Sequence, residues 1–158
     1  RLGDGLTCVK AGEVDGAVIC GMGGPLMVRI LQTSYAVWQS LKFVVLQPQS
    51  DAGALRRYLY EHGWHIEDER LVIDDGRLYE LMRAVPGQAG ALPDWIYDIG
   101  PVNWQRRDPL LSRKIDILME TKGHILEGLK KSRKDVHERM EKIESELRFW
   151  RELKWQLQ

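Results

Sequence analysis

The sequence has few cysteines, no net charge and no long apolar run. Its two cysteines, Cys8 and Cys20, are spaced like neither a metal site nor a redox motif, which predicts a reduced, cytoplasmic protein. No apolar stretch approaches the roughly 18 residues of a membrane span, and the first residues do not resemble a signal peptide. We therefore expect a cytoplasmic protein with no membrane partner and no metal site.

The composition is that of a folded protein. With 44% hydrophobic and 29% charged residues, the 158-residue chain is neither disordered nor collagen-like. Its charge is unevenly spread, because residues 1–103 carry 9 basic and 13 acidic side chains (net −4), whereas residues 104–158 carry 14 and 10 (net +4). The positive part indicates an anionic partner such as nucleic acid, and ordinary solvated helix charges are the simpler alternative.

The N-terminal part alternates short apolar runs with helical stretches. From these patterns we expect strands at 16–20 and 42–46, helices at 25–31 and 51–62, and strands at 64–73 and 77–85. The first two strands are apolar throughout, as in a parallel sheet buried on both faces. Asp74-Asp-Gly76 predicts a hairpin turn between the last two. The order indicates an α/β sheet that ends in an antiparallel hairpin.

The C-terminal part is almost entirely helical. The turn formers between Pro86 and Pro93 read as a linker, which predicts one domain at 1–88 and a second at 89–158. Two apolar stripes repeat with 4, 3 spacing, one at 111, 115, 118, 122, 125 and 129, the other at 136, 140, 143, 147, 150, 154 and 157. Each stripe is too narrow to be buried alone.

These stripes favour an antiparallel coiled-coil hairpin that turns near Lys130 to Lys134. In that arrangement Leu118 and Ile125 should meet residues such as Met140, Ile143 and Leu147. One long helix that dimerises is the alternative.

Three short motifs could carry chemistry. Gly21-Met-Gly-Gly24 follows an apolar strand, where glycines let a ligand approach the backbone and the amides of the next helix favour anions. Asp4, between two glycines, could accept a hydrogen bond from an adenine amine. Gln47-Pro-Gln49 places amides at the end of the second strand. Taken singly, the first two motifs are equally well explained as turns, and the third as a loop whose amides bond only to the backbone.

A nicotinamide-dependent oxidoreductase is disfavoured. Leu26 stands where a dinucleotide fingerprint has its third glycine, and no acidic residue ends the next strand.

Taken in order, the motifs resemble one family. Gly3-Asp-Gly-Leu6, Gly21 to Gly24, Leu46 to Gln49, the hairpin from Asp75 to Glu80 and Gly100-Pro101 together resemble the bacterial tRNA adenine-N(1)-methyltransferases (TrmK), which act at nucleotide 22 of tRNA. The resemblance runs over almost the whole chain. Gln49 is a departure, because the family more often has asparagine there, and both amides donate similar hydrogen bonds.

The resemblance implies a Rossmann-like, class I fold that uses S-adenosylmethionine, and hence that the chain forms the C-terminal half of such a sheet followed by the helical hairpin. The implied cofactor-binding residues are Asp4, Gly5, Gly21, Met22, Gly23 and Gly24. The implied substrate cleft is lined by Gln47, Pro48 and Gln49. Candidate contacts to tRNA phosphates are Arg106, Arg107, Arg113, Lys114, Lys130, Lys131, Arg133 and Lys134. Tyr79 and Glu80 are expected to pack the hairpin rather than to catalyse.

The family's Asp-x-Gly loop for the methionine part of the cofactor has no counterpart in the sequence. We therefore expect the first cofactor-binding strand and the catalytic residue upstream of Arg1, and residues 1–158 alone to be inactive. The strand at Gly16–Cys20 should then have an open edge through which the chain could self-associate. The alternative to an enzyme is a non-catalytic α/β protein-interaction module with a coiled-coil tail.

Overall fold

The computed structural model describes residues 1–132 and 136–157. The chain divides into two compact units, Arg1–Asp108 and Pro109–Gln158. Each unit is described by itself below.

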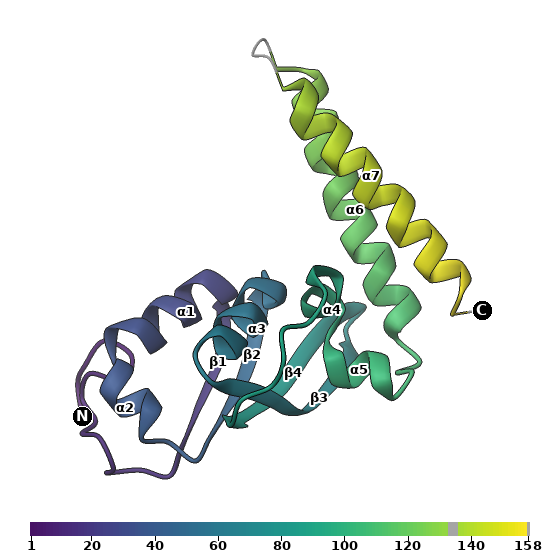
Figure 1. The fold of residues 1–158 in the computed structure, drawn as a ribbon. Coiled ribbons are helices and arrows are strands. Elements are labelled where there is room, and N and C mark those ends of the chain that lie inside the picture. The colour runs from purple at the N-terminus through teal and green to yellow at the C-terminus, as the bar shows by residue number, and fades with distance from the viewer. Residues whose placement is uncertain (133–135, 158) are drawn as a thin grey trace. The chain divides into compact units, whose positions relative to one another are not determined.

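The first unit contains the predicted sequence of strands and helices. Its elements are β1 (Gly16–Gly23), α1 (Gly24–Thr33), α2 (Tyr35–Gln39), β2 (Phe43–Ser50), α3 (Ala52–Glu61), β3 (Trp64–Asp74), β4 (Arg77–Pro86), α4 (Asp94–Ile99) and α5 (Pro101–Gln105) (Figure 1). The β-α-β-α order with a terminal hairpin is confirmed. The short helices α2, α4 and α5 were not predicted, because five or six residues are too few to show a helical period.

The sheet has the strand order β1-β2-β4-β3. β1 and β2 are parallel, with Gly16 opposite Phe43 and Cys20 opposite Gln47. β4 runs antiparallel to both β2 and β3. The β3–β4 turn has positive φ at Asp75 (46°) and Gly76 (73°), the geometry for which an Asp-Gly pair is favoured. Within the described residues β1 lies at an edge of the sheet, as expected.

Helices α1 and α3 pack on the sheet and enclose an aromatic core. The indoles of Trp38 and Trp64 are fully buried and stack with ring centroids 5.5 Å apart. Tyr58 also stacks with Trp38, with ring centroids 5.3 Å apart. These rings join α2, α3 and β3, so α2 is anchored by one large side chain despite its length.

A buried ionic cluster connects α4 and α5 to the sheet and to α3 through hydrogen bonds. The fully buried guanidinium of Arg56 donates to Glu69 (3.0 Å), to Glu80 (2.8 Å) and to the carbonyl of Tyr97 (2.9 Å). Glu69 also accepts the N–H groups of Val102 (2.7 Å) and of the residue after it.

Because of these bonds, residues 94–105 pack as part of the first unit. The compact units meet at Asp108 and Pro109, not at residues 88 and 89. The turn formers before Pro93 mark a surface loop within the first unit.

The second unit consists of two helices, α6 (Leu111–Lys130) and α7 (His137–Trp155), which lie side by side in Figure 1. They are antiparallel, since Lys122 pairs with Glu146 (2.5 Å) and Lys154 pairs with Asp116 (2.5 Å). Lys131, Ser132 and Val136, which lie between the two helices in the sequence, are not helical, so residues 115–155 do not form one continuous helix.

The core between α6 and α7 differs by one position from the predicted stripe. Leu126 packs with Ile143 and Leu147, whereas Ile125 is 41% exposed. A straight helix has 3.6 residues per turn, so a stripe extrapolated at 3.5 drifts toward its C-terminal end. Knobs-into-holes packing along the seam stays a prediction.

Candidate functional site

The glycine motif lies at the carboxyl end of β1, beside the end of β2. Because the two strands are parallel, Met22 comes opposite Pro48 and Gly23 opposite Ser50. The N–H of Gly21 donates to the side-chain oxygen of Gln47 at 3.0 Å. The structure therefore brings two of the three predicted motifs together at the edge of the sheet where ligands of open α/β folds bind.

The conformation of this loop depends on glycine at two positions. Gly21 has φ +77°, which side chains other than glycine rarely adopt. A Cβ at Gly24 would lie 2.4 Å from the carbonyl oxygen of Asp51, so only glycine lets α1 begin this close to the start of α3. The first turn of α1 contains Pro25 and has no side-chain cap. A helix N-terminus whose amides are not bonded by a capping side chain favours an anion.

Asp4 and Gly5 pack against α1, the helix that begins at the glycine motif. The Asp4 carbonyl accepts the Thr7 hydroxyl at 2.9 Å, which closes a turn, and a Cβ at Gly5 would lie 2.8 Å from the side chain of Ile30. A small cavity of about 20 Å³ is lined by Asp4, Leu26, Arg29, Ile30 and Thr33. Within residues 1–132 and 136–157 the Asp4 carboxylate has neither an ion pair nor a hydrogen bond. It is therefore available to a donor.

A pocket of about 220 Å³ opens beside the end of β2. It is lined by Pro48, Gln49, Arg77, Leu78 and Tyr79. The two β2 residues belong to the predicted substrate cleft, but the three hairpin residues were missed. The alternation of side chains along a strand could have pointed to Tyr79, because it places Tyr79 and Glu80 on opposite faces of the hairpin strand. Glu80 itself has the packing role that was expected, in the buried cluster around Arg56.

The candidate phosphate contacts differ in accessibility. Arg107 and Lys131 are exposed, and three others are engaged in surface ion pairs: Arg106 with Asp68, Arg113 with Glu120 and Lys130 with Glu127. Arg106 holds the pKa of Asp68 below its usual range through a direct hydrogen bond.

Lys114 is a correction to this set. It is only 7% exposed and is thus not positioned for a surface phosphate, because it lies beside Ile115 on the buried stripe of α6. Arg133 and Lys134 lie outside the described residues.

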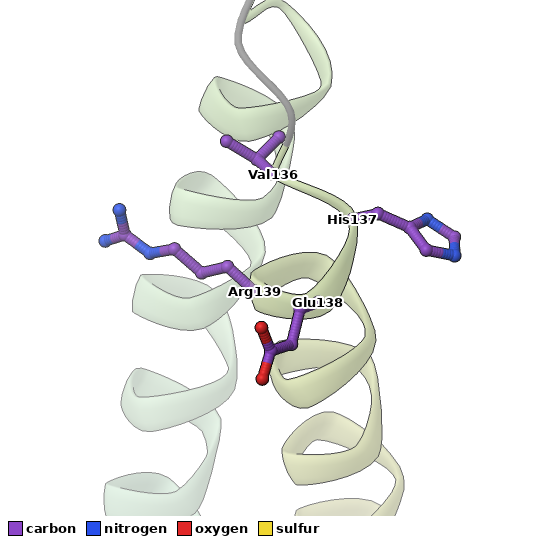
Figure 2. Close-up of a pocket in the computed structure, with 4 residues that line it drawn as sticks. All are labelled: Val136, His137, Glu138 and Arg139. Carbon is purple, nitrogen blue, oxygen red and sulfur yellow. The ribbon is translucent and has the colours of Figure 1, made fainter.

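A second, more open pocket of about 470 Å³ lies at the start of α7, lined by Val136, His137, Glu138 and Arg139. Figure 2 shows these side chains leaving the first turn in different directions, with His137 and Arg139 on opposite sides. They do not converge on a common point, so they form no binding site. Nowhere in residues 1–132 and 136–157 do three His, Cys, Asp or Glu side chains gather as a metal site would require. None of the helices there combines the length and apolar surface of a membrane-spanning segment.

Comparison with solved structures identifies the same architecture elsewhere. The M1A22 tRNA methyltransferase TrmK of B. subtilis has a TM-score of 0.80 and 25% identity, over 96% of this chain and 68% of that one. The protein Sp1610 of Streptococcus pneumoniae, solved in complex with S-adenosyl-L-methionine, also has a TM-score of 0.80 and 25% identity, over 96% of this chain and 66% of that one. The Rossmann-like methyltransferase fold is therefore confirmed.

The sequence comparisons agree with the structural ones. A curated relative, the tRNA (adenine(22)-N(1))-methyltransferase of Bacillus subtilis (strain 168), is 36% identical over 96 residues, which make up 61% of this chain and 40% of the relative. These similarities confirm the resemblance to TrmK proteins and favour an enzyme over a non-catalytic interaction module. The family model described as a methyltransferase domain matches residues 1–82, and since this is more than half of the chain, the protein belongs to that family.

Proposed function

We propose that the protein transfers a methyl group from S-adenosylmethionine to N1 of adenine 22 in tRNA. The observation that carries this proposal is that Gly21–Gly24 and Gln47–Gln49 lie side by side at the carboxyl ends of the parallel strands. It is supported by 36% identity to a tRNA (adenine(22)-N(1))-methyltransferase over 96 residues. The chain spans 40% of the length of that relative, and the activity is proposed for the whole protein.

The residues that would hold the cofactor fit its chemistry. S-adenosylmethionine supplies a methyl group activated on a sulfonium. Asp4 has an exposed carboxylate with no partner in the described chain, suited to accept the exocyclic amine of an adenine, and Gly5 (φ +58°) keeps the backbone beside it free of a side chain. Gly21 to Gly24 offer close approach to the backbone at the start of α1.

The substrate residues would act by positioning. Adenine N1 has a lone pair and lies on the Watson–Crick edge, so a paired or stacked base must be exposed before it can react. The remaining requirement is to align N1 with the methyl group, which well-placed contacts provide without acid–base chemistry. Gln47, Pro48 and Gln49 border the glycine loop and are suited to this task.

Binding of tRNA would use cations on both units. Arg106 and Arg107 of the first unit, and Arg113, Lys130 and Lys131 of the second, are exposed enough to reach phosphates. Such contacts release counterions, so the affinity for tRNA should fall steeply with added salt. Since tRNA is modified in the cytoplasm, the protein would act there.

Self-association through β1 is a separate proposal, which concerns residues 1–158 taken alone. The strand lies at the edge of the described sheet and carries Val18, which is 68% exposed. An open, apolar strand edge pairs readily with another strand. Sedimentation of residues 1–158 should show concentration-dependent dimers that Val18→Lys weakens, and a monomer at all concentrations would contradict this.

The activity is tested with protein expressed from the complete reading frame that contains residues 1–158. We expect it to methylate a tRNA transcript with adenine at nucleotide 22, detected by a reverse-transcription stop at that base. A transcript with guanine 22 is the matched control and should remain unmodified. Equal methylation of both transcripts, or of neither, would contradict the proposal.

A further inference from the structure

The pocket beside the end of β2 forms where two paired strands separate. β2 and β4 are hydrogen-bonded from Val44 opposite Ala84 to Leu46 opposite Met82, and no further. If the same register continued, Gln49 would face Tyr79. The strands instead diverge, and the space of about 220 Å³ opens between the end of β2 and the start of β4.

The β4 wall of this pocket is held in place from behind. Glu80, next to Tyr79, accepts a hydrogen bond from the fully buried Arg56 at 2.8 Å. Successive side chains of a strand point to opposite faces, so this buried bond directs Tyr79 to the other face. Arg83 lies on the same face of β4 as Tyr79, and its guanidinium is 4.9 Å from the ring centroid of Phe43 in β2. Side chains of β2 and β4 therefore lie next to each other on this face of the sheet.

The pocket lining suits a single planar, polar ring. Its volume is below the range of about 300–1,000 Å³ that accommodates drug-sized ligands. Tyr79, half-buried, offers an aromatic face, and Pro48, buried, offers an apolar one. The Gln49 amide can both donate and accept hydrogen bonds, as the edge of a nucleobase requires. Arg77, exposed, adds a positive charge beside the ring site.

The pocket is adjacent to the glycine loop. Gln47, which precedes the two β2 residues of the pocket, accepts the N–H of Gly21 at 3.0 Å. The position that a Cβ would take at Gly21 lies 4.0 Å from the side-chain nitrogen of Gln49. A ring in the pocket would thus lie beside the proposed cofactor loop, as a methyl acceptor must.

We propose that this pocket receives the target adenine after it leaves the tRNA stack, with Tyr79 stacking on the base and Arg77 contacting the phosphate of the same nucleotide. The inference rests on the proposed function and assigns the acceptor-positioning role to the β3–β4 hairpin. Stacking of a base on an aromatic side chain changes affinity by about 5- to 150-fold. Tyr79 is a positioning residue, and its hydroxyl has no part in the role.

The first test compares variants in the protein expressed from the complete reading frame. Tyr79→Ala should lower kcat/KM for tRNA by about 5- to 150-fold, and Tyr79→Phe, which keeps the ring, should stay within about twofold of the unsubstituted protein. Tyr35→Ala is the matched control, because Tyr35 is 50% exposed and lies on α2, outside the pocket lining. It should leave kcat/KM within about twofold.

A second readout does not depend on turnover. A tRNA with 8-azidoadenine at nucleotide 22 should crosslink on irradiation to peptides that contain Gln49 or Tyr79, and Tyr79→Ala should reduce the yield. Crosslinks confined to other peptides, or equal kinetics for Tyr79→Ala and Tyr35→Ala, would overturn the inference. The proposed function would still stand if the unsubstituted protein methylates the tRNA. Weakened binding of S-adenosylmethionine with unchanged crosslinking would show that the pocket belongs to the cofactor and would also overturn it. Absence of both tRNA binding and methylation would instead reject the proposed function, and the inference with it.

Discussion

The two units of the chain are stabilised in different ways. The first unit encloses stacked indoles and a buried ionic cluster that also joins elements distant in sequence, α3 to α4 and β3 to α5. The second unit has two helices with an apolar cluster of Leu126, Ile143 and Leu147, further buried side chains such as Ile115 and Trp150, and ion pairs at its sides. The core of the first unit is built from side chains of many elements, whereas the core of the second unit lies between two helices only.

This difference fits what each unit is proposed to do. A base must be placed beside a methyl donor with an accuracy well within about 1 Å. The strands that end at the pocket must therefore be held rigidly by the residues packed against them. Contact with phosphates acts over longer distances and tolerates mobile cations. The predictions below, in order of decreasing effect, test whether the units differ in this way.

The largest effect is expected from Arg56→Met. It would leave the carboxylates of Glu69 and Glu80 buried without their cation, which typically destabilises a protein by about 3–5 kcal/mol. Burial alone would lower the pKa of Arg56, but the two carboxylates outweigh it and hold the pKa above its usual value, so the guanidinium is charged at any working pH. Urea unfolding followed by tryptophan fluorescence measures the loss.

Arg57→Ala is the control, one residue along α3. Arg57 pairs with Asp94 at 3.0 Å on the surface, and exposed pairs contribute only about 0–1 kcal/mol. Similar losses for the two variants would show that the buried cluster is not what holds the first unit together.

A smaller effect, confined to the second unit, is expected from Leu126→Ala. Truncating a buried leucine typically costs about 2–5 kcal/mol, and the 8% exposed Leu126 should fall toward the low end because its cluster is small. Hydrogen exchange should show lost protection in α6 and α7, with β1 to β4 unchanged. Ile125→Ala, at the neighbouring 41% exposed position, should change little. The reverse ranking would restore the seam predicted from the 4, 3 spacing.

The difference between the predicted position, Ile125, and the buried one, Leu126, shows how much of the structure can be predicted from sequence patterns. The strands and long helices of both units could be predicted, because period and turn residues are local signals. Asp75-Gly76, between two strand-like segments, predicted the hairpin. The unit boundary could not be, because the bonds from Glu69 to the start of α5 join residues more than 30 positions apart. A linker composition cannot reveal such long-range contacts.

The candidate site divides along the same line. The family resemblance implied that Gly21 to Gly24 hold the cofactor and that Gln47 to Gln49 line the substrate cleft, and the parallel strands bring the two motifs together. Arg77 and Tyr79 were missed as pocket residues, because their place depends on where β2 and β4 stop pairing. Lys114 was misassigned because charge alone does not reveal that its side chain is buried.

Removing one exposed cation should have a moderate effect on tRNA affinity and none on the fold. Arg107→Ala and Lys131→Ala, one in each unit, should each reduce the slope of log affinity against log salt by about 1 if the residue contacts a phosphate. Lys42→Ala, which removes an exposed cation paired with Asp15 at 2.9 Å, is the matched control and should leave the slope unchanged. Unchanged slopes for both test variants would remove these residues from the proposed tRNA contacts.

The smallest effect concerns a surface ion pair in the first unit, between Asp68 and Arg106. The hydrogen bond from Arg106 lowers the pKa of the Asp68 carboxyl below its value in the unfolded chain, about 3.9. The stabilisation is therefore fully present above pH 3.9 and is lost as the pH falls through the lower, folded value. Both side chains are about two-fifths exposed, so solvent screening limits the gain to at most about 1 kcal/mol. NMR titration of Asp68 should give a midpoint below 3.9 that Arg106→Gln raises. A midpoint unmoved by that substitution would show that the pair does not form in solution, and that β3 is joined to the start of α5 through the backbone N–H groups that Glu69 accepts rather than through this ion pair.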